Sequence, residues 1–223
     1  MNRPFLIALA LTVAASLLPA SASRAGEAAA WGRIDDLATG NAVAGPAGWL
    51  NYCMAARGTC GAPVPSTEVA PTPETLAVVE RVQAEVNGRL TARAEPPGRD
   101  LWQVAPASGD CEDYALTKQV LLRAAGLPPG VVRLATVTLP NGEYHAVLTV
   151  ATTRGTLVLD NLRAGAVPLD AVPYRWLRLE DPAGGLRWKE LRSEPVVAAA
   201  QPASRRRPDH RDHDAAATGT IAQ

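Results

Sequence analysis

Three side chains that could together carry out acyl transfer lie in the second half of the chain: Cys111, His145 and Asp160. A thiolate attacks an amide carbonyl, an imidazole carries the proton, and a carboxylate holds that imidazole in one tautomer. A lone cysteine or a lone histidine is more often structural. The combination favours a catalytic site, because His145 is predicted to face Asp160 and Cys111 is predicted to begin a helix.

The cysteine stands at the start of an apolar pattern with helical spacing. This pattern ends at Gly126, with Pro128 just beyond, so we expect a helix with Asp110 as its N-cap and Cys111 as its first residue. A thiol in the first turn faces unpaired backbone N–H groups and the positive end of the helix dipole, which both favour the thiolate. The position therefore predicts a partly activated nucleophile.

Strands should carry the other two residues. Asn141-Gly142 is a strong hairpin signal between two β-type runs. A second hairpin, centred within Thr152-Thr153, would put His145 directly opposite Asp160 and within hydrogen-bonding reach. A register slip of one residue would put Asn161 opposite instead. The expected strands are residues 131–139, 143–151 and 156–160.

The remaining segments give weaker signals. Residues 73–90 carry apolar side chains at spacings of three and four, which predicts an amphipathic helix. Residues 172–179 are interpreted as a strand, and 184–188 as a turn followed by a short edge segment. Residues 26–72 are rich in Ala, Gly and Pro and show little periodicity.

The composition is that of a globular protein without net charge. Lys and Arg number 22, Asp and Glu also number 22, and 47% of the residues are hydrophobic. A neutral chain with a pI near 6.8 offers no general basic surface for phosphates. We therefore expect one domain and no nucleic-acid partner.

Residues 1–25 have the pattern of a secretory signal peptide. Arg3 precedes a mainly apolar run of 14 residues, and small residues then offer cleavage sites near Ala22 and Ala25. A membrane anchor is the alternative, but this run is shorter than the roughly 20 residues that a spanning helix needs. We expect a periplasmic or secreted protein with no transmembrane anchor after cleavage.

The mature chain is expected to divide into a domain, residues 26–192, and a disordered tail, residues 193–223, which lacks periodicity. In an exported chain, Cys53 and Cys60 are close enough in sequence to form a disulfide. Two separate thiols are the alternative. The disulfide would leave Cys111 as the free cysteine.

Three sequence blocks around the chemical residues resemble signature blocks of the bacterial transglutaminase-like cysteine proteinases, whose LapG-like members are periplasmic. The blocks are Gly109–Ala115, His145–Leu148 and Leu159–Asn161. The resemblance covers about residues 49–188. It implies an α+β fold with a papain- and transglutaminase-like core, in which a helix bearing Cys111 packs on an antiparallel sheet bearing His145 and Asp160. It also implies that these three residues form the catalytic triad.

The resemblance further implies a metal site, because Asp110 and Glu112 match positions that bind calcium in LapG-like relatives. Local electrostatics gives a second reason to expect a metal. The carboxylates of Asp110, Glu112 and Asp113 disfavour a thiolate at Cys111, and a hard cation would relieve that repulsion. Helix capping alone would also explain Asp110. Residues 103–108 lack the acidic residue that these relatives often carry there.

The leading hypothesis is an exported cysteine peptidase that cleaves a protein of the envelope or cell surface. A membrane-protein regulator is a further candidate partner. Two alternatives remain: transfer of the acyl group to an amine, as in transglutaminases, and a binding module without catalysis. For the oxyanion, the candidate donors are the backbone N–H of Cys111 and the indole N–H of Trp102.

Overall fold

The computed structural model describes residues 30–56, 60, 63–65, 67–96 and 98–192. The predicted signal peptide, residues 1–25, and the predicted tail, residues 193–223, lie outside the described residues. Among the residues that are described, no helix combines the length and the apolar character needed to span a lipid bilayer.

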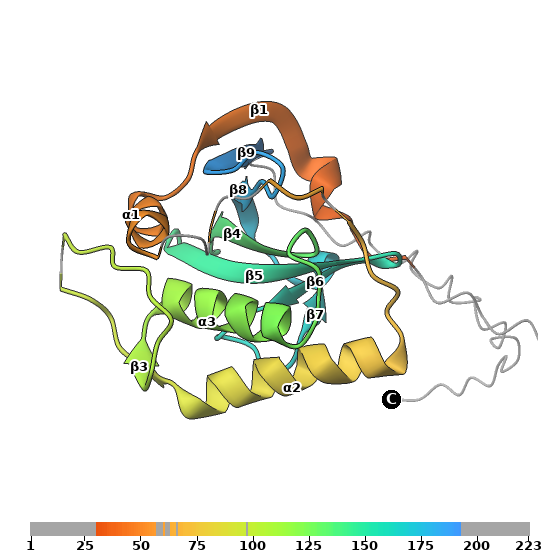
Figure 1. The fold of residues 1–223 in the computed structure, drawn as a ribbon, viewed down its shortest axis with the longest axis horizontal. Helices are drawn as coiled ribbons and strands as arrows, with labels where there is room; N and C mark the ends of the chain where they lie inside the picture. The colour runs from red at the N-terminus through yellow and green to blue at the C-terminus, as the bar shows by residue number, and fades with distance from the viewer. Residues whose placement is uncertain (1–29, 57–59, 61–62, 66, 97, 193–223) are drawn as a thin grey trace, which may run out of the picture.

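A seven-stranded antiparallel sheet forms the centre of the α+β fold that the sequence predicts, with the strand order β1-β9-β8-β4-β5-β6-β7 (Figure 1). Its strands are β1 (Ala38–Ala44), β4 (Val132–Thr138), β5 (Tyr144–Thr152), β6 (Gly155–Leu159), β7 (Val167–Pro168), β8 (Arg175–Glu180) and β9 (Arg187–Leu191). The short strands β2 (Thr91–Ala92) and β3 (Ser108–Gly109) form a separate parallel pair.

Helices cover one face of the sheet. The helix α3 (Cys111–Ala124) packs on β4 and β5, and α2 (Pro73–Arg89) packs on α3 (Figure 1). The helix α1 (Ala47–Ala55) lies near the end of the sheet at which α3 begins. Two short 3-10 helices, η1 (Ile34–Leu37) and η2 (Leu169–Ala171), complete the described elements.

Both long helices form where the sequence predicts them. Thr72 caps α2 by accepting the N–H of Thr75 at 3.2 Å, and the apolar residues of this helix recur at helical spacing. The helix α3 ends before Gly126, whose φ of +97° is readily adopted by glycine. Asp110 does occupy the N-cap position of α3, but its side chain makes no capping hydrogen bond.

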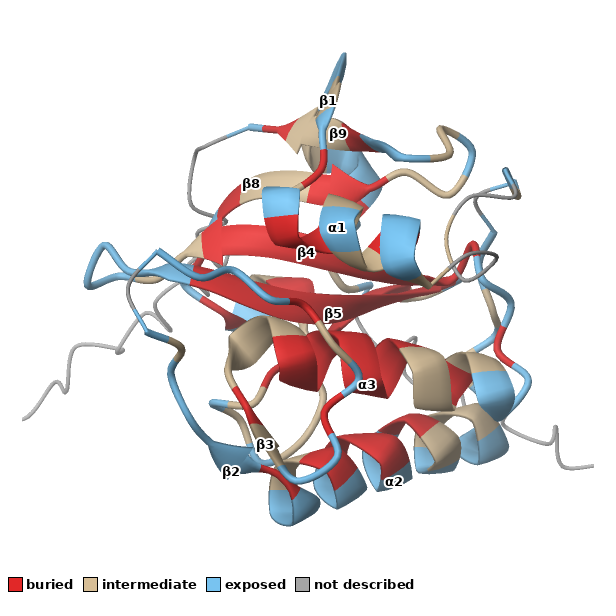
Figure 2. Cartoon of the chain, turned by 60° about the vertical axis from the view of Figure 1, so that its left-hand side comes forward, coloured by how far each residue is buried: buried red, intermediate tan, exposed pale blue. Residues whose placement is uncertain are grey.

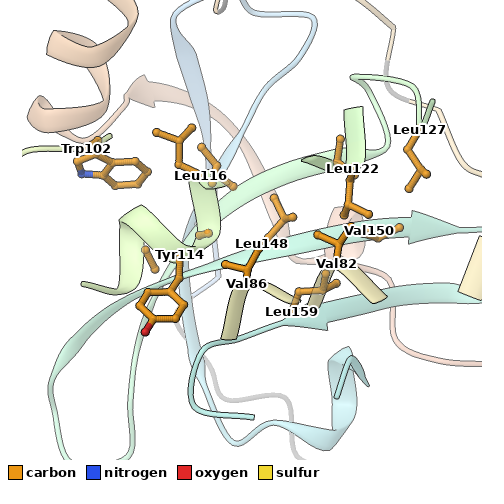
Figure 3. Packing of buried hydrophobic residues seen from close by; sticks show 14 of the residues in the cluster. Val82, Val86, Trp102, Tyr114, Leu116, Leu122, Leu127, Leu148, Val150 and Leu159 are labelled. Carbon is orange, nitrogen blue, oxygen red and sulfur yellow. The ribbon is translucent and has the colours of Figure 1, made fainter. Parts of the chain in front are cut away.

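Alternating side chains divide the core between the two faces of the sheet. Leu148, Val150 and Leu159 point toward α2 and α3, whereas Val147 and Val158 belong to a second apolar cluster on the opposite face. Figure 3 shows the first cluster, in which sheet residues meet side chains of both helices. The strands β4 and β5 are consequently buried along most of their length (Figure 2).

The hairpin between β5 and β6 differs from the prediction by two residues. Thr152 pairs with Gly155 and Leu148 with Leu159, so the loop contains residues 153–154 and is centred one residue later than expected. If this register continued beyond β6, Asp160 would be opposite Val147, so the prediction that it lies directly opposite His145 is wrong. A shift of two positions leaves both side chains on the same face, because side chains alternate along a strand.

The edge of the sheet also differs from the prediction. The segment after Gly185 forms β9, as expected, but β9 lies between β8 and β1 and is not an edge strand. The edge strand next to β9 is β1, which comes from the segment without clear periodicity. The expected disulfide between Cys53 and Cys60 is confirmed, and it joins α1 to the chain that follows it.

Candidate active site

His145 and Asp160 are joined by a buried hydrogen bond. The distance between Nε2 of His145 and Oδ1 of Asp160 is 2.8 Å, and the two residues are 5% and 0% exposed. Although the two residues are not directly opposite, they lie on one face and come together diagonally at the end of the β5–β6 hairpin. The sequence therefore predicts the contact between His145 and Asp160 correctly, although the hairpin register from which it is predicted is wrong.

Asp160 is held as a carboxylate by several hydrogen bonds. Burial raises its pKa, but hydrogen bonds from His145, from the backbone N–H of Leu162 and from Tyr174 outweigh burial and bring the pKa below its usual value. An ionised Asp160 accepts hydrogen bonds only, so Nε2 of His145 is the donor. The lone pair of a neutral imidazole then lies on Nδ1.

Cys111 is the first residue of α3, as the sequence predicts. Its thiol donates a hydrogen bond to Oε2 of Glu112 at 3.1 Å. Burial, followed by the negative charge of Glu112, raises the pKa of Cys111 well above its usual value, and the backbone N–H of Ala146 only partly opposes this rise. The start of a helix therefore does not activate this sulfur by itself.

One pocket, about 260 Å³ in volume, contains both the sulfur and the imidazole. Cys111 and His145 line it together with Glu112, Trp102 and Tyr144. Within the described part of the chain, no hydrogen bond joins the thiol to His145. The arrangement can perform acyl transfer once the thiol proton passes from the Glu112 side to the imidazole.

Carboxylates from two segments meet beside the sulfur. Oxygen atoms of Glu95, Asp110 and Glu112 all lie within 4.8 Å of one another. Burial is the main cause that raises the pKa of Glu112 to about 7. The sequence identifies Asp110 and Glu112 as metal candidates but misses Glu95, because only the fold brings the chain around residue 95 next to the start of α3.

Asp113 does not join this group of carboxylates. It is 1% exposed, and its Oδ1 accepts the backbone N–H of Gln103 at 2.9 Å. Burial raises the pKa of Asp113 to about 6. Its place in the structure is to fix the loop that precedes α3, where a Cβ on Gly109 would lie 2.3 Å from Oδ2 of Asp113.

Trp102 lines the pocket, but its indole N–H is already bound. Nε1 donates to Oδ1 of Asp100 at 2.8 Å, while Oδ2 of Asp100 accepts the N–H of Gly48 at 2.8 Å. The suggestion that this indole is an oxyanion donor is therefore wrong for the geometry observed. Asp100 thus links the loop before α3 to α1, where a Cβ on Gly48 would lie only 2.3 Å from the backbone oxygen of Asp100.

The family model described as bacterial transglutaminase-like cysteine proteinase matches residues 39–195. The calcium-bound structure of Legionella pneumophila LapG is 24% identical, covers 59% of this chain and 77% of that chain, and superposes with a TM-score of 0.47. The EGTA-treated form is also 24% identical, covers 50% and 65% of the two chains, and has a TM-score of 0.44. No curated protein matches significantly.

The family model spans most of the described domain and includes the segments that carry Cys111, His145 and Asp160. The structure also contains the cysteine-bearing helix on an antiparallel sheet that the sequence blocks imply. The chain therefore belongs to the bacterial transglutaminase-like cysteine proteinases.

Proposed function

We propose that this cysteine peptidase cleaves a peptide bond in a protein of the cell envelope or surface, through an acyl-enzyme formed on Cys111. In this proposal, His145 is the general base and acid, and Asp160 orients it. The observation that carries the proposal is the 2.8 Å hydrogen bond between His145 and Asp160 at the pocket that contains the Cys111 sulfur.

The proposed reaction begins with transfer of the thiol proton from Cys111 to Nδ1 of His145. The thiolate attacks the carbonyl carbon of the substrate, and the backbone N–H at the start of α3 stabilises the oxyanion. The C–N bond then breaks while the imidazolium protonates the leaving amine. Water next loses a proton to His145 and attacks the thioester, which releases the carboxylic acid and returns the proton to the sulfur.

Replacement of the nucleophile tests the assignment. Cys111→Ala is expected to abolish cleavage, and a Cys111→Ala strain should accumulate the same uncleaved surface protein as a deletion strain. Both proteomes should be compared in the periplasmic, secreted and surface fractions. Retained cleavage by a folded Cys111→Ala protein would reject Cys111 as the nucleophile, and incorporation of a labelled primary amine would identify amine transfer instead of hydrolysis.

Export is part of the same proposal. The apolar leader of residues 1–25 supports it, and a disulfide such as Cys53–Cys60 persists most readily outside the reducing cytosol. A periplasmic or secreted location also places the pocket where envelope proteins can reach it. A membrane-protein regulator would act in the same compartment.

We also propose that calcium binds at Glu95, Asp110 and Glu112. The fit is chemical: three carboxylate oxygens are the ligands that a hard cation prefers, and Oδ1 of Asp110 is buried without a hydrogen-bond partner among the described residues. A bound cation would supply positive charge beside Cys111, opposite in sign to the carboxylates that now raise the pKa of its thiol.

Calorimetric titration with CaCl₂ tests this site directly. Glu95→Gln should weaken calcium binding about tenfold or more, because it removes one charged ligand from a different segment than the other two. Glu85→Gln is the matched control, since Glu85 is an exposed carboxylate on α2. Equal affinity in the wild type and Glu95→Gln would remove Glu95 from the site.

A further inference from the structure

Tyr174 binds the carboxylate oxygen of Asp160 that His145 does not bind. The residue precedes β8, is 3% exposed, and donates its hydroxyl to Oδ2 of Asp160 at 2.5 Å. The other two donors, His145 and the N–H of Leu162, both bind Oδ1. Tyr174 thus binds Oδ2, the carboxylate oxygen that His145 and Leu162 do not bind. Because both oxygens accept hydrogen bonds, the plane of the carboxylate is fixed.

The same tyrosine also packs against the histidine. The two ring centroids are 6.3 Å apart, and the planes meet at 75°, an edge-to-face arrangement. Tyr174 therefore touches both groups of the His145–Asp160 pair, one through its hydroxyl and one through its ring. A rotation of either group would break one of these contacts.

Packing accounts for the ring of Tyr174 but not for its hydroxyl. The surrounding cluster is apolar and includes Val137, Val147 and Trp176, so a phenylalanine would fill the same space without a buried polar atom to satisfy. Burial, reinforced by the hydrogen bond to Asp160, raises the pKa of Tyr174 to about 12. The hydroxyl consequently remains a donor throughout the neutral range.

Other groups around Asp160 act more indirectly. Lys118 of α3 is the buried cation whose charge Asp160 stabilises, and Arg163 lies near the Tyr174 hydroxyl. From α2, the amides of Gln83 and Asn87 donate to the backbone oxygen of Asp160, at 2.7 and 3.1 Å, and leave its carboxylate untouched. Unlike these groups, Tyr174 makes a direct hydrogen bond to the carboxylate of Asp160.

We propose that Tyr174 is a positioning residue that fixes the Asp160 carboxylate and, through it, sets the orientation and basicity of His145. This inference rests on the proposed catalytic role of the pair. A hydroxyl that donates to Oδ2 draws negative charge away from the oxygen that faces His145. Without that hydroxyl, the carboxylate should stabilise the imidazolium more strongly.

An NMR titration of the purified protein tests this directly, because His145 is one of only three histidines in the chain and can be assigned with His145→Asn. Tyr174→Phe should move the midpoint of the His145 titration upward by about 0.5 to 1 pH unit. Tyr114→Phe is the matched control: Tyr114 is equally buried, and its hydroxyl donates to the backbone oxygen of Leu90 at 2.7 Å. It should leave the midpoint unchanged.

A second variant covers the case in which Tyr174→Phe fails to fold. Replacing Tyr174 with 3-fluorotyrosine keeps the shape and the hydroxyl but makes that hydroxyl a stronger donor, so the His145 midpoint should move downward. An unchanged midpoint in folded Tyr174→Phe, or the same shift in Tyr114→Phe, would overturn the proposal. The titration needs no substrate, so its outcome is separate from loss of cleavage in Cys111→Ala.

Discussion

The sulfur of Cys111 has neighbours that act on its proton in opposite directions. Glu112 accepts the thiol hydrogen bond, while the N–H of Ala146 favours the thiolate. Burial is the larger influence, because a low-dielectric surrounding disfavours the charged form of a thiol. Position at a helix start is visible in sequence, but burial is not, so the sequence alone predicts a more acidic thiol than the structure contains.

At this scale, Trp102→Phe should lower kcat less than tenfold. Loss of an oxyanion donor typically costs a hundredfold or more, but this indole N–H is already bound to Asp100. The aromatic ring would still fill the space beside Trp188, which it meets edge-on at 6.3 Å. Steady-state kinetics on the identified substrate give the answer, and a loss of a hundredfold or more would restore the indole as an oxyanion donor.

On the scale of elements, α3 buries a lysine, which is unfavourable for folding, and the apolar pattern of the helix does not reveal this. Lys118 is 0% exposed, and its Nζ has no hydrogen-bond partner in the described residues, although the ring of Tyr114 lies 5.9 Å away. Burial lowers the pKa of Lys118 to about 7. In the unfolded chain this pKa is near 10.5, so the unfolded state binds more protons between about pH 7 and 10.

The stability of the wild type should therefore rise with pH across that window, and Lys118→Met should lose this rise. At pH 7 the variant should be more stable by about 1 to 3 kcal/mol, because a flexible apolar side chain replaces a buried amine. Urea unfolding at several pH values measures both effects. Lys189→Met is the control, since Lys189 is partly exposed and faces Asp35 and Asp181; an equal change of slope there would contradict the assignment to Lys118.

At the level of the whole molecule, local patterns predict the central elements well. The structure contains α2 and α3 where the apolar spacing predicts them, and a turn at Asn141-Gly142. Cys111 begins a helix, and His145 and Asp160 lie on or next to strands, as predicted. The observed hairpin register differs by two positions from the one that the sequence predicts, but period-two alternation keeps each side chain on the predicted face. His145 meets Asp160 because both side chains lie on the same face of the sheet, and not because the two residues are directly opposite.

What the sequence misses is set by contacts between distant segments. The strand β1 contains small residues and a glycine and is mostly exposed, so it has no periodic pattern and gains its structure from pairing with β9. Glu95 and Tyr174 are likewise ordinary residues in sequence. Each becomes significant only because the fold places it against Glu112 or Asp160.

The Cys53–Cys60 bond shares its chain with a third cysteine, and this has a chemical consequence. Exchange between a thiol and a disulfide proceeds through attack by the thiolate. Burial and the acidic neighbour keep Cys111 protonated, so it is a poor attacker of that bond. The features that raise the pKa of this thiol thus also guard the chain against scrambling its own cysteines.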